Sequence, residues 1–431
     1  MGEVKIFLVR VGLLLIINLL IFNGIQAQQG VPKPRILVSS DIGGTDPDDF
    51  QSLIHLLMYA DLFQIEGLIS SPYGNGRTSD ILDMIALYEL DYPKLLERRA
   101  DFPEPGDLRK ITKQGALNGA PFLGYSIATE GSDWIIQSAM KKSNQPLWVL
   151  VWGGLEDLAQ ALHDKPEIKN HIKVYWIGGP NKKWSVNAYS YIAANHPDLW
   201  MIEANATYRG WFMDEDSPAD ISNKNFYTNY IQGRGAMASN FEEHYGGEIK
   251  MGDTPSLAYV MNGNPDEPSG ESWGGSFDRI DRSSRAIFFG ASSSADTVAA
   301  YATLEWRFEG PNLDIARDSV VFEIQIQDQL WPGYYLGDGV YGVKYSSKKP
   351  EIGAYRTSSG IAELDALQGE YVSSVPWPAK PSATDYILGE NWFSDRQDPT
   401  YFLQDQQGAK TVSKYREEFM RDWAKRWEWL K

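Results

Sequence analysis

The fold of this chain is decided by the stretch Ile36-Leu37-Val38-Ser39-Ser40-Asp41-Ile42-Gly43-Gly44-Thr45-Asp46-Pro47-Asp48-Asp49. It begins with a short apolar run that ends at Asp41. Residues 50–59 follow, with leucine and isoleucine at helical spacing. An apolar strand that leads through a polar turn into a helix predicts the first unit of an alternating α/β fold.

The same alternation continues along the chain to residue 202. Strands are predicted at 65–69, 147–151, 174–177 and 199–202, and helices at 81–90, 134–140, 155–162 and 188–194. Continuous apolar strands between amphipathic helices indicate an open, mostly parallel sheet with helices on both faces. Ligands of such sheets bind at the carboxyl ends of the strands, where this chain has polar or glycine-rich turns.

The pattern changes after residue 285. Residues 286–385 alternate apolar and polar side chains with a period of two between recurrent turn signals, which predicts an antiparallel, Ig-like β-sandwich. Residues 408–430 are again helical, with one apolar stripe. We expect residues 386–431 to pack back on an α/β domain of residues 35–285, which makes the β-sandwich an insertion. The alternative is that this last helix belongs to the β-sandwich.

The composition limits the chemistry of the protein. A length of 431 residues suits two domains, and 43% hydrophobic residues support a large core. The absence of cysteine excludes disulfides, thiolate nucleophiles and cysteine-bound zinc. A net charge of −17 argues against nucleic acid as a partner, because phosphate binding needs a basic face. Because the five histidines are scattered, a bound metal is expected to be a hard cation held by oxygen.

The first residues have the pattern of a targeting segment. Lys5 and Arg10 precede the apolar run Val11–Phe22, and Ala27 ends a plausible cleavage site. Residues 1–27 are therefore predicted to be a signal peptide of a secreted or periplasmic protein, with no membrane partner after cleavage. The alternative is an uncleaved membrane anchor.

Four carboxylates stand within nine residues at the end of the first predicted strand, at positions 41, 46, 48 and 49. Like charges this close repel one another and raise one another's pKa. A helix N-terminus relieves part of this repulsion, and one aspartate can serve as a simple N-cap. The remaining carboxylates indicate a bound divalent cation, and Ca²⁺ accepts six to eight oxygen ligands in irregular geometry.

The segment from Asp41 to Asp49 resembles the aspartate-rich fingerprint of inosine–uridine-type nucleoside hydrolases. It is closer to the nucleoside hydrolase-like domain of secreted, cellulose-binding Sde182-type proteins. Three later stretches agree in order and spacing: Gly74-Asn75, Val151-Trp152-Gly153-Gly154-Leu155 and Gly252-Asp253-Thr254-Pro255-Ser256-Leu257-Ala258-Tyr259. The resemblance covers residues 35–285 and the tail from 391 to 430, and implies an open α/β fold of the nucleoside hydrolase kind.

The resemblance also implies roles for individual residues. The implied ligands of a Ca²⁺ ion are Asp41, Asp49, Asp253 and the backbone carbonyl of Trp152. The implied substrate-binding residues are Asn75, Asp48, Asn187 and Asp253. The implied catalytic residues, one of them a general base, are Asp41, Asp46 and Asp48. Because the fingerprint is longer than the hydrolase form, either Asp41 or Asp46 stands for its first metal ligand.

One departure from the family pattern bears on catalysis. Gly252 stands where many of these hydrolases carry the histidine that protonates the leaving base, and glycine has no proton to give. Glu271 and Glu203 are candidate replacements. Two functions follow: a calcium-dependent hydrolase that acts on a glycosidic bond of a carbohydrate or nucleoside, or a non-catalytic carbohydrate-binding protein on the same scaffold.

The region after residue 286 offers aromatic side chains as sugar platforms. The candidates are Trp331, Tyr334, Tyr335, Trp377 and Trp392. The alternative for each is a place in the core, and the whole region is alternatively a structural or partner-binding module. Lys182 and Lys183 lie in a turn at the expected ligand edge, either in contact with an acidic sugar or solvated.

Overall fold

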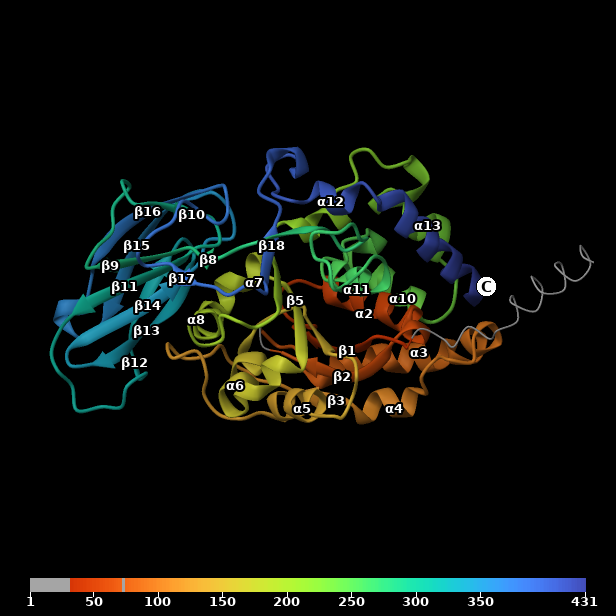
Figure 1. Ribbon diagram of the computed structural model, residues 1–431, viewed down its shortest axis with the longest axis horizontal. Coiled ribbons are helices and arrows are strands. Elements are labelled where there is room, and N and C mark those ends of the chain that lie inside the picture. Colours follow the sequence, from red (N-terminus) through yellow and green to blue (C-terminus); the bar gives the residue numbers. More distant parts are fainter. Residues whose placement is uncertain (1–31, 72–73) are drawn as a thin grey trace, which may run out of the picture. The chain divides into compact units, whose positions relative to one another are not determined.

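The computed structural model describes residues 32–71 and 74–431 (Figure 1). The predicted signal peptide, residues 1–27, lies outside the described residues and stays a prediction. Among the described residues, no helix combines the length and the apolar character needed to cross a membrane.

Within residues 35–431, the first sheet, here called the parallel sheet, contains eight strands in the order β3-β2-β1-β4-β5-β6-β18-β7. Their bounds are β1 (Arg35–Ser40), β2 (Gln64–Ser70), β3 (Thr112–Gln114), β4 (Leu147–Val151), β5 (Ile172–Ile177), β6 (Met201–Ala204), β7 (Phe277–Arg279) and β18 (Trp392–Asp395). All neighbouring pairs are parallel except β18 and β7. The mostly parallel sheet predicted from the sequence is confirmed.

Helices cover both faces of the parallel sheet. The main ones are α2 (Asp48–Met58), α3 (Thr78–Arg98), α5 (Glu130–Ala139), α6 (Glu156–Asp164), α8 (Val186–Asn195), α11 (Thr254–Met261) and α13 (Arg416–Trp427). Figure 1 shows α5 and α6 on one face and α2 and α11 on the other. Because successive side chains of a strand point to opposite faces of the sheet, neighbouring residues of β1 belong to two different cores. Val38 belongs to the core that includes α2 and α13, and Leu37 to the core that includes α5, α6 and α8.

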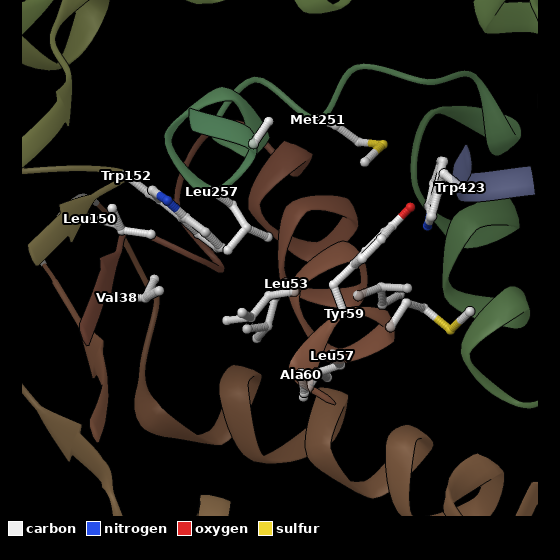
Figure 2. Close-up of a cluster of buried hydrophobic side chains, with 14 of the residues drawn as sticks. Val38, Leu53, Leu57, Tyr59, Ala60, Leu150, Trp152, Met251, Leu257 and Trp423 are labelled. Carbon is white, nitrogen blue, oxygen red and sulfur yellow. The ribbon is translucent and has the colours of Figure 1, made fainter. Parts of the chain in front are cut away.

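The core on the α2 face lies directly beneath the strand ends that carry the aspartates. Figure 2 shows Leu53 of α2 pointing toward Val38 and Leu150 of the sheet. Each of these three side chains is at most 1% exposed. Burial of this kind stabilises the folded state by about 2 kcal/mol for each aliphatic side chain. It therefore holds α2, which begins at Asp48, against the parallel sheet.

The elements that the sequence pattern did not predict are short. They are α4 (Pro105–Lys110), α7 (Gly179–Trp184), α9 (Asn223–Phe226), α10 (Met237–Glu243), α11, the strands β3, β7 and β18, and the 3₁₀ and π turns between residues 207 and 247; α12 (Lys410–Ser413) lies within the helix predicted at 408–430. One or two turns show no clear apolar period, so hydrophobic spacing does not reveal them.

The second large sheet, here called the β-domain sheet, also has eight strands within the described residues, in the order β10-β16-β15-β12-β13-β14-β11-β9. Their bounds are β9 (Arg285–Phe289), β10 (Thr297–Ala299), β11 (Thr303–Glu309), β12 (Val320–Ile326), β13 (Gln329–Gly337), β14 (Val340–Tyr345), β15 (Glu351–Ser359) and β16 (Gln368–Ser374). The sheet is largely antiparallel, with parallel pairs at β9–β11 and β10–β16.

This sheet curls around an aromatic core, as a sandwich does. The ring of Trp306 in β11 lies 4.9 Å from Tyr355 in β15 and 6.0 Å from Tyr371 in β16, although these strands are far apart in the sheet order. The five aromatic residues expected as sugar platforms are all at least 93% buried: Trp331, Tyr334, Tyr335, Trp377 and Trp392. The alternative given for each of them, a place in the core, therefore holds at all five positions.

After the β-domain sheet the chain returns to the parallel sheet. β17 (Tyr386–Ile387) pairs with β8 (Arg282–Ser283), and β18 then enters the parallel sheet between β6 and β7. Trp423 of α13 is fully buried and lies 5.3 Å from His55 of α2 and 5.1 Å from Phe226. Arg426 of α13 donates to the Met58 carbonyl at 3.0 Å and pairs with Asp61. The last helix therefore shares the core of α2.

We predict that Trp423→Ala lowers the free energy of unfolding by about 4 kcal/mol, because it leaves a cavity between α13 and α2. Urea unfolding of the full chain measures the change. Leu90→Ala is the matched control: this side chain of α3 is 70% exposed, and its loss is expected to cost about 0.5 kcal/mol or less. Equal effects of the two substitutions would show that α13 does not support the core.

Candidate functional site

The predicted aspartates gather at the carboxyl edge of the parallel sheet. Asp41 directly follows β1, Asp48 and Asp49 open α2, and Asp253 stands at the N-terminus of α11. The first turn of a helix favours negative charge, so two helices point their positive ends at the same place. Residues separated by about 200 positions in the sequence are thereby brought together.

Asp48, Asp49 and Asp253 form one compact group of carboxylates. Each offers an oxygen that lies within 4.8 Å of the others, and all three residues are buried. The Ser40 hydroxyl donates to Asp49, and the Gly252 backbone N–H donates to Asp48 Oδ2 at 3.0 Å. Among the residues that the structure describes, no lysine or arginine forms an ion pair with Asp49 or Asp253.

The close approach of these buried carboxylates raises their pKa values. Burial raises the pKa of Asp49 to about 7, although the hydrogen bond from Ser40 acts in the opposite direction. Burial and the nearby charges of Asp49 and Asp48 raise the pKa values of Asp253 and Asp41 well above the usual range. A divalent cation relieves this repulsion, so the donor set fits an oxygen-bound metal.

Asp46 has a different environment from the compact group. Its carboxylate accepts hydrogen bonds from Lys250 and Tyr245 and is about half exposed. Burial works against ionisation here, but Lys250 and Tyr245 outweigh it and lower the pKa of Asp46. Asp46 is thus already neutralised by the protein, whereas Asp41 lies next to Asp49, and no lysine or arginine of residues 32–71 and 74–431 forms an ion pair with it.

These carboxylates line a pocket of about 350 Å³. Trp152, Trp184 and Tyr208 contribute to its walls, together with Lys250. The Trp152 carbonyl accepts a hydrogen bond from the Asn181 amide at 3.2 Å, which leaves one lone pair of that oxygen. The lining of the pocket therefore combines acidic oxygens with aromatic side chains.

Gly252 is required by the position of Asp48. A Cβ atom at residue 252 would lie 2.4 Å from Asp48 Oδ2, so any side chain here forces the carboxylate to move. The missing side chain lets the backbone N–H approach that carboxylate. No histidine is among the described residues that line the pocket.

Four predicted residues lie away from this pocket. Asn75 is exposed, and Asn187 donates to the Ala120 carbonyl at 3.0 Å in an adjoining hollow. Glu203 is fully buried and pairs with Lys182 at 2.7 Å, while Glu271 pairs with Lys414 at 2.5 Å on the surface. Neither glutamate lines the pocket, so the structure does not bring a replacement for the histidine from these positions.

Several residues that line the pocket were not predicted from the sequence. Tyr208 and Lys250 come from the irregular segment before α11, and Gln329 and Lys348 come from the β domain. Lys250 stands two residues before Gly252, so its position in the sequence could have indicated that it lies near the pocket. The other three have no local pattern that points to the aspartates.

A parallel sheet with a carboxylate pocket at its carboxyl edge defines an α/β domain of the nucleoside hydrolase-like class. The chain belongs to the family described as cellulose-binding Sde182, nucleoside hydrolase-like domain, whose family model matches residues 35–277. A second match, to a domain of unknown function (DUF5060), covers residues 297–360. No curated protein matches the chain.

Several solved structures are similar to the chain. A nucleoside hydrolase-related hypothetical protein from Saccharophagus degradans, associated with carbohydrate metabolism, has 18% identity and a TM-score of 0.49 over 80% of this chain and 100% of that one. The inosine-uridine preferring nucleoside hydrolase from Bacillus anthracis has 14% identity and a TM-score of 0.37 over 59% and 87%. A purine-preferring ribonucleoside hydrolase from Gardnerella vaginalis has 14% identity and a TM-score of 0.33 over 58% and 84%. At these identities, the substrates of those proteins do not transfer to this chain.

We predict that Asp253→Asn raises the stability of the protein in chelator by about 1 kcal/mol, because it removes one of several buried, mutually repelling charges. Thermal unfolding in EDTA measures the change. Asp61→Asn is the matched control, since that buried aspartate is paired with Arg426 and its loss is expected to lower stability by about 3 kcal/mol. A lower melting temperature for Asp253→Asn would contradict the repulsion inferred here.

Proposed function

We propose that this protein is a calcium-dependent hydrolase that acts on a glycosidic bond, N-glycosyl or O-glycosyl, of a carbohydrate or nucleoside. The observation that carries the proposal is the group of three buried carboxylates, whose oxygens lie within 4.8 Å of one another while Asp49 and Asp253 lack a cationic partner among the described residues. The predicted signal peptide adds the proposal that the protein acts outside the cytoplasm.

The residues proposed to hold calcium are Asp41, Asp49, Asp253 and the carbonyl of Trp152. Asp41 is preferred to Asp46 as the first ligand, because Lys250 and Tyr245 already engage the carboxylate of Asp46. Bound calcium supplies a Lewis acid that orients a water molecule and lowers its pKa.

The protein's own groups then define what the pocket does to a sugar. Asp48 is fixed by the Gly252 N–H at 3.0 Å and is proposed to accept hydrogen bonds from sugar hydroxyls and to take a proton as general base. The surrounding carboxylates stabilise the positive charge of an oxocarbenium-like transition state. Trp152 and Tyr208, both buried, keep water away from the remaining space.

A second candidate function is carbohydrate binding without catalysis. Gly252 and the lack of histidine among the described lining residues favour it, because a leaving group then has no imidazole to protonate it. General acid catalysis is worth about 10²–10⁴ in rate. The description of the family as cellulose-binding also supports carbohydrate binding without catalysis.

We predict that Ca²⁺ raises the melting temperature of the protein, because a ligand that binds only the folded state stabilises it. When the Ca²⁺ concentration is one hundred times the dissociation constant, the free energy of unfolding rises by about 2.7 kcal/mol. Differential scanning fluorimetry with and without 2 mM Ca²⁺ measures it. Asp253→Ala should abolish the shift, whereas Asp46→Ala should preserve it. No shift for the unaltered protein would remove the metal from the proposal.

We predict that the mature protein releases sugar from one member of a panel of nucleosides, aryl glycosides and plant oligosaccharides in Ca²⁺. Asp49→Ala is expected to lose at least about 10²-fold in rate, because the site loses both a metal ligand and charge stabilisation. Reducing-sugar release measures the reaction. If nothing is released but calorimetry shows binding on the same panel, the second candidate function replaces the first.

A further inference from the structure

The β domain contributes to the carboxylate pocket. Gln329, the first residue of β13, and Lys348, in the turn between β14 and β15, both line it. These residues lie outside the segment that matches the nucleoside hydrolase-like family, which ends at residue 277. We call Gln329 and Lys348 the roof of the pocket, and the carboxylates of Asp41, Asp48, Asp49 and Asp253 its floor.

The roof is positioned by contacts between the β domain and α7. Lys183 of α7 donates from Nζ to Gln329 Oε1. The next residue, Trp184, packs against Trp331 of β13 with ring centroids 4.9 Å apart. Because Oε1 of Gln329 is engaged, its amide N–H groups are the part of the side chain left to bind a ligand, and no protein acceptor contacts them within the described residues.

Positive charge concentrates behind and beside this roof. Lys183 is only 5% exposed and forms no ion pair with a carboxylate in the described chain. It lies among the rings of Trp184, Trp331 and Tyr345 at 5.5–5.6 Å. Burial and the charges of Lys348 and Lys349 lower the pKa of Lys183, whereas the carboxylate of Glu351 acts in the opposite direction. Such a cluster is unexpected in a chain with a net charge of −17.

The lining of the pocket therefore contains two kinds of group. Its floor offers hydrogen-bond acceptors and negative charge, whereas its roof offers the amide donors of Gln329 and the ammonium of Lys348. Sugar hydroxyls can donate to the floor. The donors of the roof are complementary to a group that only accepts hydrogen bonds and carries negative charge. Charge-assisted hydrogen bonds between such groups are about twice as strong as neutral ones. The floor repels the same group, which fixes the orientation of the ligand.

We propose that the pocket selects sugars with an anionic substituent, a carboxylate or a sulfate, which Lys348 and Gln329 bind while the sugar hydroxyls face the aspartates. This inference rests on the proposed function, since it assumes that a sugar occupies the pocket. It adds the substrate class: an acidic sugar rather than a nucleoside or a neutral glucan. It also gives the β domain a direct role in specificity.

Calorimetric titration of the full chain in 2 mM Ca²⁺ tests the proposal. The probes are the methyl glycosides of glucuronate and galacturonate, the 6-sulfates of methyl glucoside and methyl galactoside, and the two neutral methyl hexosides. We expect the uronates or the sulfates to bind about tenfold more tightly than the neutral sugars, and the advantage to shrink in 0.5 M salt. The arm that binds more tightly identifies the anionic group.

Lys348→Ala is expected to remove about tenfold of the affinity for the acidic sugar and to change neutral-sugar affinity less than about twofold. Lys349→Ala is the matched control, because it removes the same charge from the next residue, which does not line the pocket. Gln329→Glu, which keeps the size of the side chain but adds a repelling charge, should also weaken the acidic sugar. Each variant's melting temperature reports its folding.

Three outcomes would overturn the inference. Equal affinity for acidic and neutral sugars, or equal losses in Lys348→Ala and Lys349→Ala, would overturn it and leave the proposed function standing. Binding of no sugar of either kind, with the calcium-induced rise in melting temperature intact, would overturn both the inference and the assignment of the pocket to sugars.

Discussion

The mutual repulsion of carboxylates buried at one sheet edge is the constraint on which the structure depends. Asp48, Asp49 and Asp253 are buried with oxygens within 4.8 Å of one another. Such a group persists only if the surrounding packing is rigid enough to oppose its repulsion. The core beneath α2 and α11 provides that rigidity, and the positive N-termini of both helices reduce the repulsion. Fold stability and site chemistry are therefore coupled.

Two features distinguish this site from a simple acidic cluster. Gly252 lets a backbone N–H reach Asp48 Oδ2 at 3.0 Å, and Lys250 Nζ lies 3.8 Å from the same oxygen. The β domain places Gln329 and Lys348 in the lining of the same pocket as the aspartates. The pocket is therefore lined by residues of both the α/β domain and the β domain.

Much of the α/β fold was predictable, because long apolar strands and amphipathic helices have a local signature. The strand before Asp41 and the helix after Asp49 were recognised from hydrophobic spacing, and β4 and β5 likewise. The link between Asp49 and Asp253 came from resemblance to a family, since no local pattern joins residues 200 positions apart. The aromatic candidates stayed open between a sugar platform and the core, because composition does not reveal which face of a strand is covered: Trp377 and Trp392 are fully buried.

The amino-acid pattern was enough to establish an α/β protein with an acidic turn after its first strand, and to indicate a hard cation as its partner. It did not separate the roles of Asp41 and Asp46, because both stand in one short loop. The fold gives the two residues different surroundings: Lys250 and Tyr245 engage Asp46, while Asp41 lies beside Asp49. Nor did it place Gln329 and Lys348 in the pocket. Hydrophobic periodicity indicates which side of a helix or strand is buried. Contacts between segments far apart in the sequence depend instead on how the folded elements pack against one another.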